Sequence, residues 1–299
     1  MPSIRARLVN RYVRTVMKPK PLHEIDPPEL RAWVEKSVIP LLPKGVAREE
    51  VDGAVAGEWQ RPANADGRRT IYYLHGGGYV FGSPRTHRTL TYPLALAAGA
   101  EVFSLAYRLA PEHPCPAAIN DAVAGYDWLL SQGRRSEEIV MAGDSAGGGL
   151  VVTTLLALKE RGRPLPAGAV LYSPFVDFAM EGASLDHNAE SDAMFNKTSL
   201  IEGSKKYRGM LDTRDRRLSP IYADLSGLPP MFVFASRSEM LFDDAVRLVQ
   251  KARAGGVDAR FEERDGLVHV WPLFHPLLPE AKQAIKASAD FIRRCTAPK

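Results

Sequence analysis

Apolar residues in most of this chain occur in short continuous runs that alternate with longer segments of helical periodicity. The runs predict strands at 69–74, 101–107, 138–142, 168–173, 231–236 and 259–264. Runs of this kind are typical of parallel strands covered on both faces. The intervening segments predict helices near 86–98, 116–131, 146–160, 242–254 and 277–294. The alternation predicts an α/β fold with a mostly parallel sheet, helices on both faces and a ligand site at the carboxyl ends of the strands.

Two segments do not follow this alternation. Residues 1–45 predict helices at 3–17 and 27–38, and they precede two weak strand candidates at 46–51 and 55–60. The polar stretch 179–217 interrupts the βα pattern and predicts a helix near 198–211. An insertion of this length in a compact fold is usually a lid rather than a bare loop. We therefore predict a helical cap of residues 1–45 and 179–217 over a core of residues 46–178 and 218–299.

The first predicted helix is basic and amphipathic. Six cations, from Arg5 to Lys20, precede the first acidic residue, Glu24, and apolar residues fall among them at helical spacing. Such a helix can lie on an anionic membrane, or it can cover an apolar cleft while its charges face water. In the second interpretation the covering face consists of Leu8, Val9, Val13 and Val16.

Composition narrows the class of protein without identifying a reaction. The 299 residues are 45% hydrophobic and 25% charged, with a net charge of +4, as in an ordinary globular protein. No apolar run approaches the ~18 residues of a membrane-spanning helix, and the N-terminal residues lack the pattern of a signal peptide. The expected location is therefore the cytoplasm. Cys115 and Cys295 lie far apart without metal-ligand spacing, so neither a disulfide nor a metal site is expected.

A serine nucleophile is predicted at the turn between the strand at 138–142 and the helix at 146–160. Residues 143–148 read Gly-Asp-Ser-Ala-Gly-Gly, a Gly-x-Ser-x-Gly sequence. In such an elbow the serine adopts strained backbone angles, and the glycines allow strand and helix to approach closely. This turn would expose the Ser145 hydroxyl above the strand ends and direct the backbone N–H of Ala146 toward the same space.

A glycine-rich loop follows the strand at 69–74. Residues 75–78 read His-Gly-Gly-Gly, which suits backbone N–H groups directed at a developing oxyanion. We predict that Gly77 and Gly78, with Ala146, supply these donors. The next three residues, Tyr79, Val80 and Phe81, are candidates for lining an acyl pocket, although residues of this type also suit the protein core.

With the segment 107–114, which reads Tyr-Arg-Leu-Ala-Pro-Glu-His-Pro, these motifs resemble the hormone-sensitive-lipase-like family of α/β-hydrolases over roughly residues 70–275. The resemblance implies a serine carboxylic-ester hydrolase that forms an acyl-enzyme and needs no metal or organic cofactor. It implies short- to medium-chain esters or lactones as substrates. It also favours the interpretation of the N-terminal helix as part of a cap. The family residues that match Tyr107, Arg108, Glu112 and Asp121 form a scaffold behind the glycine loop.

The catalytic base and acid are expected after Ser145, because the triad order in α/β-hydrolases is Ser, acid, His. His269 follows the strand at 259–264 and lies in His-Val-Trp-Pro-Leu-Phe, which resembles the family segment; His275 instead precedes Pro276 at a helix boundary. Val270 stands where the family usually has glycine, so it is expected to narrow the pocket. The family motif Asp-x-Leu-x-Asp-Glu matches residues 239–244 and assigns the acid to Glu239. The next candidate, Asp243, also suits the first turn of a helix.

Two other functions remain compatible with these motifs. One is a small-molecule receptor, as in the gibberellin receptors built on this family, although those lack the catalytic histidine that His269 supplies here. The other is an amidase or peptidase with the same triad, although such peptidases generally carry a large extra domain. The expected partner is a small ester, with no nucleic acid, no integral membrane segment and a possible homodimer.

Overall fold

In the computed structural model, which describes residues 1–38 and 42–298, the strands form one eight-stranded sheet in the order β1-β2-β4-β3-β5-β6-β7-β8. The pairings from β4 through β8 are parallel, and β2 is antiparallel to both β1 and β4. The strands are β1 (Val46–Val51), β2 (Gly57–Pro62), β3 (Thr70–Leu74), β4 (Glu101–Leu105), β5 (Ile139–Asp144), β6 (Gly168–Tyr172), β7 (Met231–Ser236) and β8 (Ala259–Arg264). The predicted mostly parallel α/β fold is confirmed.

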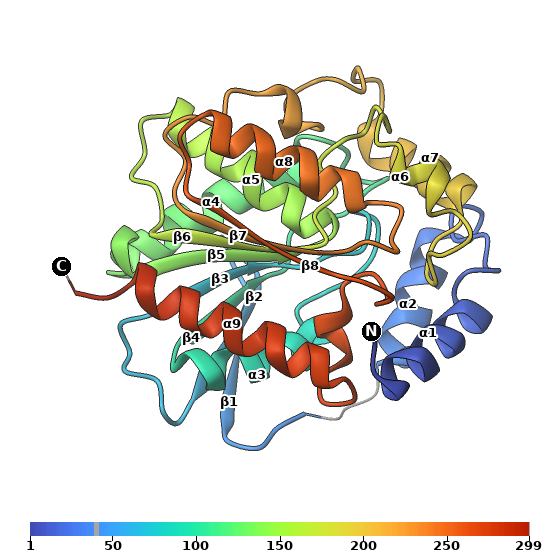
Figure 1. Cartoon of the computed structure of the whole chain (residues 1–299). Coiled ribbons are helices and arrows are strands. Elements are labelled where there is room, and N and C mark those ends of the chain that lie inside the picture. The colour runs from blue at the N-terminus through green and yellow to red at the C-terminus, as the bar shows by residue number, and fades with distance from the viewer. Residues whose placement is uncertain (39–41, 299) are drawn as a thin grey trace.

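Helices cover both faces of the sheet. On one face lie α3 (Arg88–Ala98) and α9 (Pro279–Cys295), and on the other lie α4 (Ala117–Ser131), α5 (Ala146–Glu160) and α8 (Phe242–Ala254) (Figure 1). Consecutive residues of a strand point to opposite faces, so Ile71 and Tyr73 pack in one hydrophobic cluster while Tyr72 and Leu74 pack in the other. Burial on both faces explains why these strands are continuous apolar runs in the sequence.

The N-terminal helices and the long insertion lie together at one end of the sheet, as the blue and yellow segments in Figure 1 show. They comprise α1 (Ile4–Val16), α2 (Pro27–Ser37), α6 (Ser184–His187) and α7 (Lys197–Arg208). The Asn196 side chain donates to the carbonyl of Lys18 at 3.0 Å, and the Lys18 ammonium donates to the carbonyl of Asp192 at 2.8 Å. Segments nearly two hundred residues apart in the chain are therefore joined directly.

Several predicted boundaries differ from those of the structure. The strand predicted at 55–60 is β2 (Gly57–Pro62), the one at 138–142 extends to Asp144, and the helix predicted near 198–211 ends at Arg208. Four 3₁₀ turns were not predicted; they cover Arg85–His87, Ser136–Glu138, Pro220–Tyr222 and Trp271–Phe274. Residues 39–41 of the predicted cap and residue 299 of the predicted core lie outside the described residues. Within residues 1–38 and 42–298, no helix has both the length and the hydropathy needed to cross a bilayer.

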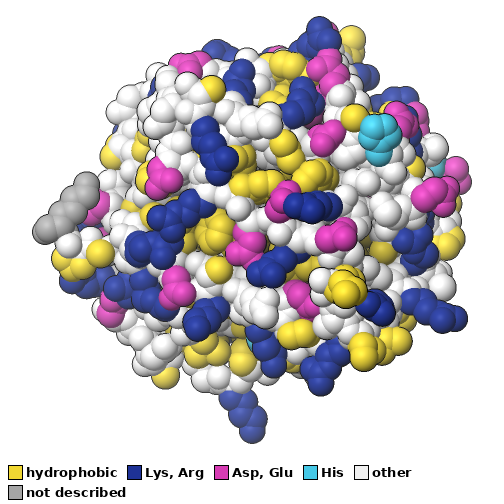
Figure 2. Space-filling view, in the orientation of Figure 1, with side chains coloured by type: hydrophobic (Ala, Val, Ile, Leu, Met, Phe, Trp, Pro, Cys, Tyr) yellow, Lys and Arg dark blue, Asp and Glu magenta, His cyan; other side chains and the backbone are white. Residues whose placement is uncertain are grey.

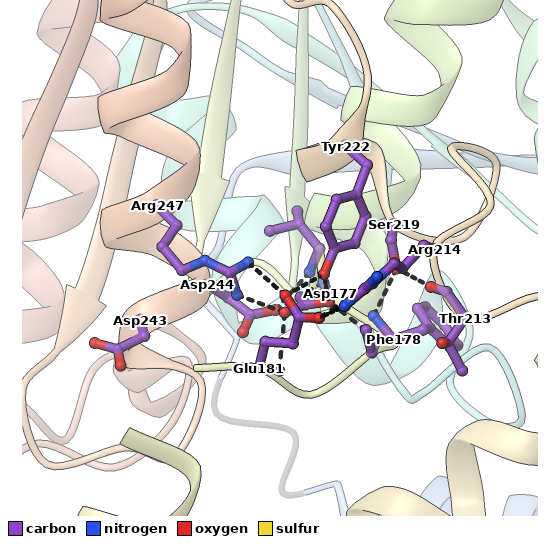
Figure 3. A network of polar contacts seen from close by, with 12 residues as sticks. Asp177, Phe178, Glu181, Thr213, Arg214, Ser219, Tyr222, Asp243, Asp244 and Arg247 are labelled. Atoms are coloured by element: carbon purple, nitrogen blue, oxygen red, sulfur yellow. Dashed lines mark hydrogen bonds and ion pairs between the residues drawn. The ribbon is translucent and has the colours of Figure 1, made fainter. Parts of the chain in front are cut away.

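A buried polar network fastens the chain after β6 to helix α8 (Figure 3). Asp244 accepts hydrogen bonds from the N–H groups of Val176 and Asp177 at 2.8 and 3.0 Å. The fully buried Asp177 also pairs with Arg247 at 2.5 Å, and Tyr222 donates to it at 3.2 Å. Burial raises the pKa of the Asp244 carboxyl to about 8, and the neighbouring Asp177 charge adds to the rise. These bonds fix the point at which the chain leaves the sheet for the insertion.

The first prediction concerns the close packing of α5 against the end of β3. A Cβ on Gly147 would lie 2.1 Å from the Leu74 carbonyl oxygen and 2.5 Å from that of His75, and backbone atoms have little freedom to move. We expect Gly147→Ala to lower the free energy of unfolding in urea by about 2 kcal/mol or more. The matched control is Gly203→Ala in α7, where a Cβ meets no atom within 4 Å. It should raise stability by up to about 1 kcal/mol. Equal effects of the two substitutions would contradict this account.

Candidate functional site

Ser145 occupies a sharp turn between β5 and α5. Its backbone angles are φ 51° and ψ −122°, outside the regions that a serine ordinarily adopts. The turn is held by the Ser145 N–H, which donates to the Tyr172 carbonyl at 2.8 Å, and by the Ser145 carbonyl, which accepts from Phe175 N–H at 2.9 Å. Glycine is required on both sides, because a Cβ on Gly143 would lie 2.5 Å from the Gly147 carbonyl oxygen. The structure therefore has the elbow geometry that the sequence predicts around Ser145.

The glycine loop after β3 closes over the same space. The N–H groups of Val80 and Phe81 both donate to the Gly77 carbonyl at 3.0 Å, so the chain turns back immediately after the glycines. Gly77 has φ 116°, and a Cβ there would lie 2.1 Å from the Phe81 carbonyl oxygen. Gly77, Gly78 and Ser145 line one cavity. Ala146 follows directly as the first residue of α5.

A buried acid–histidine pair lies beneath the glycine loop. Asp144 accepts a hydrogen bond from the Tyr73 hydroxyl at 2.6 Å and from the Gly76 N–H at 3.0 Å, and His87 Nε2 lies 3.3 Å from its other oxygen. Burial alone would lower the pKa of His87, but the Asp144 carboxylate raises it. Burial alone would raise the pKa of the Asp144 carboxyl, but the charge of His87 prevails and lowers it. The pair anchors the loop, and no role was predicted for His87.

His75 supports the loop as a neutral ring. It is fully buried and stacks on Tyr107 with ring centroids 4.2 Å apart, and burial lowers its pKa to about 3. The Tyr107 hydroxyl donates to the His75 carbonyl at 2.6 Å, and His75 Nδ1 lies 2.8 Å from the Gly76 carbonyl oxygen. Both residues therefore position the start of the glycine loop.

The other predicted scaffold residues form ion pairs at the surface. Arg108 pairs with Asp121 at 2.7 Å, and Glu112 pairs with Arg31 of α2 at 2.7 Å. Arg31 also donates to the Val80 carbonyl at 2.8 Å. Arg31 was not predicted, because its partners lie about fifty and eighty residues away and no local sequence pattern relates them.

Of the two acid candidates, the structure brings Glu239 to His269. His269 Nδ1 lies 2.5 Å from Glu239 Oε2, and both side chains are buried. The second carboxylate oxygen of Glu239 accepts from the Ser173 hydroxyl at 2.9 Å and from the Ser236 N–H at 2.5 Å. Asp243 instead accepts from the Ser184 N–H at 2.8 Å, which ties the start of α8 to α6. Ser173, which sequence analysis also missed, accepts a further bond from Val270 N–H at 3.2 Å.

The environment of His269 raises the pKa of its ring and leaves one ring nitrogen unbonded to any residue in the described ranges. Burial would lower its pKa, but the Glu239 carboxylate raises it above the ordinary value. Nε2 is buried and has no hydrogen-bond partner among residues 1–38 and 42–298. His269 and Ser145 line the same cavity.

The insertion also contacts this acid–histidine pair. Phe195 packs against His269 with ring centroids 4.8 Å apart. The buried Asp192 accepts from the N–H groups of Phe195 and Met240 at 2.9 and 2.8 Å, so it joins the insertion to the loop that carries Glu239. Neither residue was predicted, because both depend on how the insertion folds back.

The cavity has a volume of about 290 Å³ and a mainly apolar wall. Val80, Phe81 and Val270 line it, as expected for substrate-binding residues. Tyr79 is not one of its lining residues: it is buried in the core and stacks on Tyr207 with ring centroids 3.7 Å apart. Side chains from the N-terminal segment and the insertion that line the cavity include those of Met17, Leu22, Leu30, Trp33, Val34, Phe195 and Leu200.

The prediction that the apolar face of α1 covers the cavity is wrong. Leu8 is 63% exposed, while Val9 and Val13 pack in the cluster that also holds residues 267, 268, 270 and 271. Neither these three residues nor Val16 lines the cavity. The helix is held against the segment before His269, where the Asn10 amide donates to the Gly266 carbonyl at 2.8 Å. The cavity wall begins after the helix, at Met17.

The side chains that commonly bind metals are those of His, Cys, Asp and Glu. Within residues 1–38 and 42–298, no cluster of three or more His, Cys, Asp or Glu side chains could hold a metal ion. Cys115 and Cys295 are free thiols.

Comparisons with known proteins agree with the fold and identify a family. A family model for the α/β hydrolase fold matches residues 71–273. The chain is 45% identical over 244 residues to an acetyl-hydrolase of Streptomyces hygroscopicus, covering 82% of this chain and 81% of that protein. It is 36% identical over 230 residues to an esterase of Acinetobacter venetianus, covering 77% of this chain and 76% of that protein.

Solved structures extend the similarity to nearly the whole chain. A crystal structure of an esterase from the bacterial hormone-sensitive lipase family superposes with a TM-score of 0.93 at 40% identity, covering 99% of this chain and 100% of that one. The esterase EstE5, soaked with p-nitrophenyl butyrate, superposes with a TM-score of 0.94 at 38% identity and the same coverage.

The second prediction concerns the titration of His269. Its pKa should lie above the ordinary 6.5, because the Glu239 carboxylate favours the charged ring. In Glu239→Gln this attraction is lost and burial dominates, so the pKa should fall below 6.5. The matched control is Asp243→Asn, whose carboxylate bonds to Ser184 instead, and it should leave the titration unchanged. An NMR titration of the His269 ring measures all three proteins. A Glu239→Gln protein that titrates like the wild type would contradict the pairing.

Proposed function

The chain belongs to the hormone-sensitive-lipase-like family of α/β-hydrolases, and from this premise we propose that it hydrolyses carboxylic esters with Ser145, His269 and Glu239 as its catalytic triad. The observation that carries the proposal is the arrangement of the cavity. Ser145 and His269 line it together, and the far side of the His269 ring is bonded to a buried carboxylate. This is the order of groups that a serine nucleophile requires.

In the proposed reaction, the Ser145 hydroxyl attacks the acyl carbon and His269 Nε2 takes its proton. Glu239 holds the ring in the tautomer that presents Nε2 and stabilises the imidazolium that forms. The oxyanion of the tetrahedral intermediate is stabilised by the N–H groups of Gly77, Gly78 and Ala146, each worth roughly 3 kcal/mol in comparable hydrolases. His269 then protonates the leaving alcohol, and water releases the acid from Ser145 by the reverse steps.

The arrangement of charges supports these assignments. His269 must be neutral to accept a proton, and Glu239 raises the pKa of its ring, so activity should fall as the solution becomes more acidic than that pKa. The buried imidazolium is stabilised by a carboxylate that itself has three hydrogen-bond partners. A low-dielectric site of this kind strengthens the interaction as charge develops in the transition state.

The size and lining of the cavity support short- to medium-chain acyl esters, up to about eight carbons, or lactones. Its volume of about 290 Å³ lies at the small end of ligand pockets. The wall is mainly apolar, which suits an acyl chain and disfavours a charged substrate.

We further propose that residues 1–45 and 179–217 act as a cap that limits the length of the acyl chain. Met17, Leu22 and Trp33 from the first segment lie on the cavity wall with Phe195 and Leu200 from the second. Because Phe195 packs on His269 and Asp192 binds the loop that carries Glu239, the cap would shape the pocket and support the triad at once.

The third prediction tests the triad. Ser145→Ala and His269→Ala should each lower kcat/KM by more than about a thousandfold, and the double variant should be no worse, because the two groups act as one unit. Glu239→Ala should cost somewhat less, and Asp243→Ala should have little effect on rate, since Asp243 is bonded to Ser184. Circular dichroism of each variant controls for folding.

Organophosphate labelling followed by peptide mass spectrometry gives an independent readout of the nucleophile. The label should be found on Ser145 alone. Labelling of another serine, or an Asp243→Ala protein more impaired than Glu239→Ala, would contradict the assignment.

The fourth prediction concerns the acyl chain. A panel of p-nitrophenyl esters from acetate to palmitate should show highest kcat/KM for short to medium chains. Trp33→Ala removes a large side chain from the cavity wall and should shift the preference toward longer esters. The matched control is Trp128→Ala, which removes a half-buried tryptophan that packs on Phe103, away from the cavity. A wild-type preference for palmitate, or the same shift in both variants, would contradict the proposed pocket.

A further inference from the structure

The outward face of α1 carries apolar side chains where a solvated helix normally carries polar ones. Ile4, Leu8 and Tyr12 are 76%, 63% and 64% exposed, and their four-residue spacing places them in one stripe along the helix. The opposite side of the helix is packed, with Ala6 and Val13 buried. Single exposed apolar residues are common on proteins, but a continuous stripe marks an interaction surface.

Unpaired positive charges flank this stripe. Arg5, Arg7 and Arg11 are exposed, and none of them forms an ion pair with any residue in the ranges 1–38 and 42–298. The helix contains no acidic residue. Arg14, one turn further on, is instead bonded to the carbonyls of Glu190 and Ser191. Figure 2 shows hydrophobic side chains beside Lys and Arg side chains on the side of the molecule where Figure 1 places α1.

We propose that the outward face of α1, formed by Ile4, Leu8 and Tyr12 with Arg5, Arg7 and Arg11, docks on an anionic lipid surface. Leucine and isoleucine side chains partition into the boundary between headgroups and acyl chains, and a tyrosine suits the same depth. The arginines would lie at the level of the lipid phosphates, which they bind through charge-assisted hydrogen bonds.

The charge of the face favours lipid over a second copy of the chain. A two-fold symmetric dimer would bring the same patch together with itself, and three unpaired arginines from each copy would meet three like charges. No carboxylate on α1 could offset this repulsion. An anionic lipid surface supplies the opposite charge along the whole length of the helix.

Docking would not require α1 to leave the protein. The helix is tied at its start by Ser3 N–H, which donates to Glu280 at 2.7 Å, and in its middle by Asn10, which bonds to Gly266. Met17 and Leu22, which follow the helix, line the cavity. A docked helix would therefore hold one wall of the cavity close to the lipid surface. The proposal rests on the exposed face alone and does not depend on the catalytic assignments.

Sedimentation with vesicles tests this surface. We expect the full chain to bind vesicles of equal parts phosphatidylcholine and phosphatidylglycerol, to bind pure phosphatidylcholine far more weakly, and to lose affinity as salt is raised. Leu8→Glu should weaken binding at least tenfold. Replacing Arg5, Arg7 and Arg11 together by Gln should weaken it roughly a hundredfold, at about fivefold for each arginine. Met210→Glu, a control at an even more exposed apolar side chain outside α1, should bind like the wild type.

All of these variants should hydrolyse a soluble p-nitrophenyl ester at the wild-type rate, because none of the substituted residues lines the cavity. A wild-type protein that remains in the supernatant with both kinds of vesicle would overturn the proposal. So would a Met210→Glu protein as impaired in binding as Leu8→Glu. Concentration-dependent self-association that Leu8→Glu abolishes, without vesicle binding by the wild type, would assign the face to a second copy instead.

Discussion

The arrangement of the whole site depends on how closely three backbone segments approach one another at the carboxyl end of β5. The carbonyls of Leu74 and His75 at the end of β3 lie against Gly147 of α5, where even a methyl group would be within 2.5 Å of both oxygens. A methyl group on Gly143 of β5 would likewise lie 2.5 Å from the carbonyl oxygen of Gly147. This congestion forces the sharp turn at Ser145 and its positive φ. It also places the glycine loop, which follows β3 directly, beside the serine.

Two buried acid–histidine pairs each contribute a histidine to the cavity that Ser145 lines, and the two histidines differ in their surroundings. In each pair a carboxylate raises the pKa of a histidine that burial alone would make less basic. His87 has both nitrogens engaged, with Nδ1 3.2 Å from the Ser83 carbonyl oxygen and Nε2 facing Asp144. His269 engages only Nδ1, and its Nε2 has no partner within residues 1–38 and 42–298. The unbonded Nε2 of His269 fits the proposed role of this ring in proton transfer, whereas the engaged nitrogens of His87 fit a role in positioning the glycine loop.

The loop after β7 that carries Glu239 is bonded to the insertion as well as to the sheet. Asn188 donates to the carbonyls of Arg237 and Glu239, and Asp192 accepts from Met240 N–H. Lys18 in turn binds the carbonyl of Asp192 and so connects the N-terminal segment to the same loop. The wall of the cavity and the orientation of the acid are therefore parts of one hydrogen-bonded structure. Substitutions in the insertion are expected to affect both pocket shape and the basicity of His269.

The sequence by itself determined the features that depend on local conformation. The alternation of apolar runs with helical segments indicated the parallel sheet, because strands buried on both faces require such runs. The glycines around Ser145 and after His75 identified the elbow and the loop, because only glycine fits those backbone contacts. The order of the motifs left His269 as the histidine expected to face Ser145.

Only the tertiary structure decided which side chains from distant segments meet. Glu239 and Asp243 are both acidic and four residues apart, and the fold directs one to His269 and the other to Ser184. The positions predicted for Tyr79 and Leu8 at the cavity were wrong for the same reason. An apolar residue in a loop or helix can face the core, the cavity or solvent. Arg31, His87, Ser173 and Asp192 were missed because their partners are brought near by the packing of the elements. Local sequence encodes backbone conformation, whereas such pairings arise only when the sheet, the insertion and the N-terminal helices are assembled.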